Sequence, residues 1–203
     1  EAGLRELKRN LNTIIRKVII EYDDKEIHRV LGLKDIVKYL GKPKYQNIIN
    51  STLRPGLCNA LAYTPMGGVV IPIESCLYDG EGKIIASGSL GKITSESIQV
   101  ALSYIKSNKD IFQVNNCHFE HKDIHIHFLE GAVPKDGPSS GASIVTSILS
   151  LILNKNIPED IAMTGEITLR GDILTIGGLK EKILGAYNCN IKQVFIPSGN
   201  IND

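Results

Sequence analysis

The chain has 203 residues, of which 42% are hydrophobic and 22% are charged, a composition typical of an ordinary globular protein. Its 23 Lys and Arg are balanced by 22 Asp and Glu, and the net charge of +1 lacks the basic excess that nucleic-acid phosphates attract, so we expect no specific nucleic-acid binding. No stretch approaches the roughly 20 consecutive apolar residues that span a bilayer, so we predict a soluble chain with no membrane partner.

The first forty residues are predicted to form a small unit of their own. Apolar residues at three- and four-residue spacing from residue 4 to residue 18 predict an amphipathic helix. A short strand is expected at 26–30, followed by a short helix at 35–40 that Gly41 closes. The polar stretch 42–55 contains two prolines and resembles a linker. We therefore place the small unit at 1–43, the linker at 44–56 and the main domain at 57–203.

The main domain alternates strands with helices. The pattern predicts strands at 57–63, 69–77 and 83–87, a helix at 93–106, a strand at 123–128, a helix of small and apolar residues after 138, strands at 162–169 and 172–176, a helix at 179–187 and a strand at 193–196. The strand at 123–128 places Ile124, Ile126 and Phe128 on one face, which predicts that this face is buried. This mixture of strands and helices indicates an α/β or α+β domain.

The most unusual stretch is the loop 131–141, GAVPKDGPSSG. Its prolines and glycines define a tight path that delivers Ser139 and Ser140 to the N-terminus of a helix. Free N–H groups and the helix dipole favour an oxyanion there, as acyl transfer requires, so either serine is a candidate nucleophile. The alternative is that one of them is only a helix cap. A phosphate-binding loop is not expected, because Pro138 follows Gly137 where GxxxxGK[ST] would need other residues.

Histidines and cysteines are the first residues to consider for a base or a metal site. Four histidines gather around one predicted strand: His118, His121, His125 and His127. They allow a Ser-His pair or a metal site, although alternating histidines on a solvated strand face are more often surface residues. The four cysteines form no CxxC pair, which argues against a zinc knuckle or a compact disulfide framework and favours a reducing compartment.

A lysine is the other candidate base, provided that its surroundings lower its pKa. The segment 177–182 contains two, Lys180 and Lys182. Helical geometry does not choose between them, and each is also compatible with an exposed position.

Three segments taken together resemble the proteolytic domain of the Lon family of ATP-dependent proteases. They are 130–139 (EGAVPKDGPS), 162–171 (AMTGEITLRG) and 176–182 (IGGLKEK), in the family's order. The resemblance implies an α+β fold with mixed sheets, preceded by a small helical segment, and it implies a Ser-Lys dyad with Ser139 as nucleophile and Lys182 as general base. It further implies that Thr164 orients the lysine amine and that Asp136 tunes or blocks the site. The family usually has alanine where this chain has Ser140.

The resemblance also carries expectations about the longer protein. It implies an endopeptidase that degrades unfolded or misfolded proteins, assembled as a homohexamer, in the bacterial cytoplasm or the mitochondrial matrix rather than outside the cell. The small unit resembles the end of the helical subdomain of an AAA+ module, with Arg5 at the sensor-2 position. Peptide-bond chemistry would need no metal or cofactor, and ATP and Mg would belong to the ATPase module, which we expect to lie outside this piece. The family domain continues beyond residue 197, so we also expect the C-terminal end to be missing.

Two other functions remain open at this stage. A catalytically silent Lon-like domain with an assembly or binding role is the first, although the presence of both Ser139 and Lys182 argues against it. A Ser-His hydrolase that uses His125 or His127 is the second.

Overall fold

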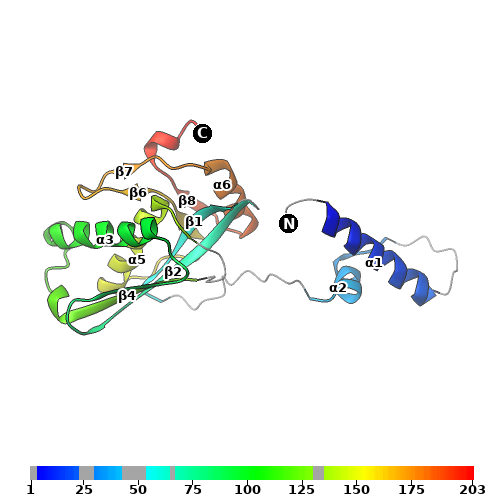
Figure 1. The fold of residues 1–203 in the computed structure, drawn as a ribbon, viewed down its shortest axis with the longest axis horizontal. Coiled ribbons are helices and arrows are strands. Elements are labelled where there is room, and N and C mark those ends of the chain that lie inside the picture. The colour runs from blue at the N-terminus through cyan, green and yellow to red at the C-terminus, as the bar shows by residue number, and fades with distance from the viewer. Residues whose placement is uncertain (1–3, 23–29, 43–53, 65–66, 130–134) are drawn as a thin grey trace. The chain divides into compact units, whose positions relative to one another are not determined.

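The computed structural model describes residues 4–22, 30–42, 54–64, 67–129 and 135–203 (Figure 1). The chain divides into two compact units, 1–48 and 49–203, and the division falls within the segment 44–56. Most of that segment lies outside the described residues, as does the expected strand at 26–30 apart from Val30. None of the described helices is both long enough and apolar enough to cross a membrane.

The first unit consists of two helices, α1 (Arg5–Tyr22) and α2 (Leu33–Leu40). Polar contacts connect them: Lys17 donates to the carbonyl of Tyr39 at 2.6 Å, and the Tyr39 hydroxyl donates to Glu21 at 2.8 Å. Lys38 also pairs with Glu21. Tyr39 is the one buried residue of these two helices.

The second unit is built on a six-stranded mixed sheet with the order β3-β4-β2-β1-β5-β8. Its strands are β1 (Leu57–Thr64), β2 (Gly67–Asp79), β3 (Ile84–Ser87), β4 (Lys122–Phe128), β5 (Ile161–Met163) and β8 (Gln193–Phe195). The β1–β2 and β2–β4 pairs are antiparallel, whereas β3 with β4, β1 with β5 and β5 with β8 are parallel. A separate antiparallel pair joins β6 (Glu166–Ile167) to β7 (Ile173–Leu174).

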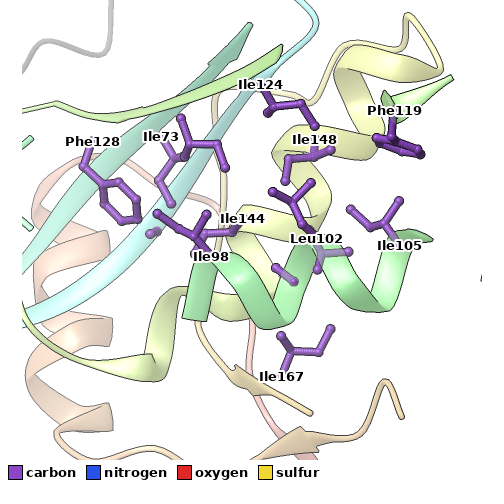
Figure 2. Packing of buried hydrophobic residues seen from close by; sticks show 14 of the residues in the cluster. Ile73, Ile98, Leu102, Ile105, Phe119, Ile124, Phe128, Ile144, Ile148 and Ile167 are labelled. Atoms are coloured by element: carbon purple, nitrogen blue, oxygen red, sulfur yellow. The ribbon is translucent and has the colours of Figure 1, made fainter. Parts of the chain in front are cut away.

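Helices cover both faces of the sheet. They are α3 (Lys92–Ser107), α4 (Lys109–Phe112), α5 (Gly141–Ile152) and α6 (Leu179–Asn188). Ile98 and Leu102 of α3 and Ile144 of α5 are at most 1% exposed and pack on one face of the sheet, which presents Ile73 and Phe128 to them (Figure 2). On the opposite face, α6 packs through Ala186 against Leu61 and Val70.

This arrangement confirms the α+β fold class, with several element boundaries shifted by one or two residues. One expectation was wrong: the strand expected at 162–169 is interrupted at Thr164 and Gly165, which separate β5 from β6. The N–H of Thr164 donates to Phe195 and that of Gly165 donates to Ser139, at 3.0 and 2.8 Å. Through these two hydrogen bonds, the segment Thr164–Gly165 holds the end of β8 next to the loop 131–141, which we call the serine loop. The strand expected at 172–176 is also shorter, and α4 was not anticipated.

Candidate active site

Ser139 lies in a 3-10 turn, Pro138–Ser140, that leads directly into α5. Its carbonyl accepts hydrogen bonds from the N–H of Gly165 at 2.8 Å and from the Thr164 hydroxyl at 3.2 Å. Ser139 is half-buried and lines a cavity of about 510 Å³. The serine is therefore held by its backbone at the wall of a cavity, a place that suits a nucleophile.

Lys182 lines the same cavity. It belongs to α6, which lies on the face of the sheet opposite to α5. The helix lies against β2 at a contact between two glycines: a Cβ on Gly185 would overlap the backbone of Gly68, and a Cβ on Gly68 would overlap the carbonyl of Glu181. Only glycine permits so close an approach of helix and strand. The contact brings Lys182 close to the start of β2, and the residue is 2% exposed.

Burial lowers the pKa of Lys182 from 10.5 to about 8, because the charged ammonium loses its hydration. A substantial fraction of neutral amine is then present near neutral pH, which a lysine base requires. Lys180, by contrast, is exposed. The structure thus distinguishes between two lysines that the sequence left equivalent.

Thr164 connects the lysine to the serine loop. The Lys182 Nζ donates to Thr164 Oγ1 at 3.1 Å, and the Thr164 hydroxyl donates its single proton to the Ser139 carbonyl. Thr164 Oγ1 therefore offers Lys182 only lone pairs, and the lysine must use an N–H to bind it. In a neutral amine this leaves the nitrogen lone pair free to accept a proton from another group in the cavity.

Ser139 and Lys182 share the cavity without a direct hydrogen bond between the hydroxyl and the amine in the described part of the chain. Such contacts are often long in a substrate-free enzyme and shorten in the complex. The remaining walls include apolar side chains from β1, β2 and β4: Ala60, Leu61, Ala62, Ile71 and Phe128. Residues 131–134 of the serine loop lie outside the described residues.

Candidate donors for an oxyanion can be narrowed down from the backbone. The N–H of Gly137 already donates to Thr94 Oγ1 at 3.1 Å, Pro138 has none, and that of Gly141 donates to the carbonyl of Pro138. The N–H of Ser140 donates the first i→i+3 bond of the 3-10 turn, to the carbonyl of Gly137, so the N–H of Ser139 remains as the candidate at this turn. Ser140 itself is buried, 8% exposed, and also lines the cavity.

Asp136 lies at the N-terminus of α3. Its carboxylate accepts hydrogen bonds from the N–H groups of Ile93 at 2.9 Å and Thr94 at 3.4 Å. This is the favourable place for an anion at a helix end. The carboxylate lines the same cavity as Lys182, but no hydrogen bond or ion pair joins the two among the described residues, so a direct effect on the lysine stays a prediction.

None of the four histidines of the described chain, His118, His121, His125 and His127, lines this cavity. His125 and His127 lie on the sheet face opposite the main core, where Ser87 Oγ bonds His125 Nε2 at 2.8 Å and His127 Nδ1 at 2.6 Å. They line a different cavity, beside Cys76. Within the described ranges no group of three or more His, Cys, Asp or Glu is placed to hold a metal ion. The geometry therefore gives no support to a histidine base for Ser139.

Some residues that shape the site were not anticipated from the sequence. Thr94 lines the cavity and binds the serine loop, and the Gly68–Gly185 contact positions α6. A glycine pair inside a strand is a known sign of close backbone approach, so Gly67-Gly68 carried a usable signal. Thr94 carried no such signal in the sequence, because a threonine in a first helical turn is common.

Arg5, named for a possible nucleotide contact, is exposed at the start of α1.

Comparison with known proteins adds an independent line of evidence. A family model described as the Lon protease (S16) C-terminal proteolytic domain matches residues 30–203. The Lon protease of Mycoplasma mycoides subsp. mycoides SC is 42% identical over the whole chain, which covers 26% of that protein. The Lon protease of Fusobacterium nucleatum is 43% identical over 98% of the chain and 27% of its own length, and that of Aster yellows witches'-broom phytoplasma is 44% identical over 100% and 26%. The chain thus spans about a quarter of these relatives.

Proposed function

Because the chain belongs to the family of Lon protease (S16) C-terminal proteolytic domains, and is by that membership a serine endopeptidase domain, we propose that it cleaves peptide bonds through a Ser-Lys dyad. Ser139 is the nucleophile and Lys182 the general base. The observation that carries the proposal is the buried lysine with its lowered pKa, bound to Thr164 in the cavity that Ser139 lines.

Acylation begins with Lys182 in its neutral form. The amine lone pair takes the proton of the Ser139 hydroxyl while Oγ attacks the carbonyl carbon of the substrate. The oxygen of that carbonyl becomes an oxyanion, and the N–H of Ser139 is the backbone donor that the turn leaves available to it. The Lys182 ammonium then returns the proton to the leaving amine as the peptide bond breaks, and an ester on Ser139 remains.

Deacylation repeats these steps with water. Lys182 is again neutral and takes a proton from the water that attacks the ester carbonyl carbon. The proton returns to Ser139 Oγ as the carboxylic acid product leaves. Thr164 keeps the amine at one position through both halves because it binds an N–H and leaves the lone pair available.

We extend the proposal to the longer protein in which such a domain works. Its substrates are unfolded or misfolded proteins, and their unfolding and delivery depend on ATP and Mg bound by an ATPase module, not by the site described above. Its assembly is a homohexamer, in which Arg5 faces nucleotide. Its location is the bacterial cytoplasm or the mitochondrial matrix. Peptide-bond cleavage itself needs no further cofactor, because Ser139 and Lys182 supply the nucleophile and the proton transfers.

The test is hydrolysis of an unstructured fluorogenic peptide without ATP, by folded wild type and by the variants Ser139→Ala, Ser140→Ala, Lys182→Ala and Lys180→Ala. We expect Ser139→Ala and Lys182→Ala to abolish turnover. Lys180→Ala is the matched control, because it removes an exposed lysine from the same helix. Loss with Ser140→Ala alone would move the nucleophile by one residue.

A folded but inactive wild type would call for the same set in the longer protein. If the longer protein also fails to hydrolyse the peptide, an assembly or binding role replaces peptide-bond cleavage as the proposed function.

A further inference from the structure

We propose that Thr94 is a positioning residue for the nucleophile, which it serves by holding the backbone just before Ser139. The inference rests on the proposed function, since it assigns a role within the same site. Thr94 lies in the first turn of α3, is 2% exposed and lines the cavity that Ser139 and Lys182 share.

The Thr94 hydroxyl binds the loop on both sides of Asp136. It accepts a hydrogen bond from the N–H of Gly137 at 3.1 Å, and it can donate its one proton to either of two carbonyl oxygens that lie 3.3 Å from Thr94 Oγ1, those of Lys135 and Gly137. Gly137 is two residues before Ser139. A change in its backbone angles therefore moves the nucleophile directly.

Asp136 completes the attachment from the loop side. Its carboxylate accepts hydrogen bonds from the N–H groups of Ile93 and Thr94. The loop therefore accepts hydrogen bonds from the N-terminus of α3 and, through the N–H of Gly137, also donates one to it. One turn further along α3, Ser97 Oγ donates to the carbonyl of Pro138 at 3.5 Å. The contact with Gly137, however, comes from Thr94 alone among these side chains.

The contact requires an atom that accepts the N–H of Gly137 and donates a proton to a carbonyl, and the hydroxyl of Thr94 does both. Valine has the shape of threonine but no polar atom, so in Thr94→Val the N–H of Gly137 loses its acceptor in a half-buried position. The glycine has no side chain to restrict its backbone, so the loop can leave its position to find a new partner. The loop then presents Ser139 at a different place relative to Lys182.

The expected kinetic result follows from that displacement. In the 203-residue chain, Thr94→Val should lower the kcat of peptide hydrolysis about ten- to a hundredfold, while KM stays within about twofold, because a misplaced nucleophile costs transition-state stabilisation rather than substrate binding. Thr94→Ser keeps the hydroxyl and should recover most of kcat. The pH midpoint of kcat should not move, because the Lys182 amine bonds Thr164 and not Thr94.

Ser95→Ala is the matched control. Ser95 lies in the same helical turn and donates its hydroxyl proton to the carbonyl of Gly91, the residue before α3, at 3.0 Å, and it makes no hydrogen bond to the loop residues that the structure describes. Its loss should leave kcat unchanged. If Ser95→Ala and Thr94→Val reduce kcat equally, or if Thr94→Val raises KM at constant kcat, Thr94 does not position Ser139.

A second measurement is independent of catalysis. Amide hydrogen exchange at Gly137, followed by NMR, should be about tenfold faster or more in Thr94→Val than in wild type and unchanged in Ser95→Ala, because an amide without its acceptor opens more readily. Thr94→Ala gives the same comparison should Thr94→Val fold poorly. Inactivity of the wild type in both the 203-residue chain and the longer protein would refute the proposed function, whereas an unchanged exchange rate at Gly137 would refute the role of Thr94.

Discussion

At the scale of single residues, the site depends on an amine that is kept away from water. Lys182 is 2% exposed, and burial lowers the pKa of its side chain to about 8. Thr164 supplies an acceptor for it in the same buried place. Burying an ammonium opposes folding, so the residue that we propose as the general base also reduces stability.

The pH dependence of peptide hydrolysis should follow Lys182. The neutral amine is the reactive form, so kcat should rise with pH and reach half of its plateau near pH 8, the pKa of this group. A pH–rate profile of the folded chain between pH 6 and pH 10 checks this. A rate that is already constant at pH 6 would contradict a lysine base with this pKa.

Replacing Lys182 by methionine should stabilise the fold while it abolishes activity. The folded pKa of about 8 lies below the ordinary 10.5, so the unfolded chain binds more protons between these values and the free energy of unfolding of the wild type rises with pH across that window. Lys182→Met removes this dependence. The gain in free energy of unfolding of Lys182→Met over wild type should be largest below pH 8 and should shrink towards pH 10.5. It should be at most a few kcal/mol, because each pKa unit is worth about 1.4 kcal/mol.

Urea unfolding at pH 7 and pH 10 measures the two limits. An advantage that is equal at both pH values would mean that the desolvated charge is not its cause.

Thr164 should affect the lysine in a way that a packing residue would not. Thr164→Val removes the oxygen that accepts the Lys182 N–H, and this bond favours the charged form. We expect the midpoint of the pH–rate profile to move to lower pH and the plateau of kcat to fall by about ten- to a hundredfold, because the amine is no longer oriented. Thr164→Ser should restore both. A fallen plateau with an unmoved midpoint would assign Thr164 to the loop contact with Ser139 alone.

At the scale of elements, the site is assembled from segments that are far apart in the chain. Ser139 comes from the start of α5, Thr164 from the break between β5 and β6, and Lys182 from α6 on the opposite face of the sheet. Residues from both faces of the sheet line one cavity, and the backbones of α6 and β2 touch at Gly185 and Gly68.

Gly185→Ala should therefore destabilise the fold and lower activity together. Alanine normally improves a helix by about 1 kcal/mol relative to glycine. Here its Cβ would overlap the backbone of Gly68, and overpacking against backbone costs about 1–3 kcal/mol or more, so the clash outweighs the helical gain. The displaced helix would withdraw Lys182 from the cavity.

Gly177→Ala is the control, since a Cβ there meets nothing within 4 Å. Urea unfolding of both variants gives the comparison. Equal stability of Gly185→Ala and wild type would mean that α6 can shift without cost.

At the scale of the whole molecule, the site lies within one of the two compact units. All residues that line the cavity belong to 49–203, whereas 1–48 contributes α1 and α2, in which Tyr39 is the one buried residue. Two helices that bury one residue have a small free energy of unfolding of their own.

A chain that begins at Ile49 should consequently fold and hydrolyse the fluorogenic peptide with a kcat within about a factor of two of the 203-residue chain, as expected of a unit with its own core. Thermal unfolding and the peptide assay check both parts of this expectation. A folded but inactive shorter chain would show that residues 1–48 contribute to the site.

The sequence by itself determined the family, the α+β class and the short list of reactive residues. Helices and most strands could be located because their burial follows the spacing of apolar residues, as in β4, where Ile124 and Ile126 alternate with polar neighbours. The serine loop was visible because its glycines and prolines are local features. The interrupted strand at Thr164 was not, because that break depends on bonds to Phe195 and Ser139.

Only the tertiary structure decided which lysine is buried, which histidines are remote and which threonine holds the loop. Helical geometry alone does not choose between Lys180 and Lys182; they differ because Lys180 is exposed, whereas Lys182 is buried and its amine bonds Thr164. Thr94 lies forty-three residues before Gly137, yet the two share a hydrogen bond. Desolvation and long-range hydrogen bonds are properties of the packed chain, so no periodicity in the sequence records them.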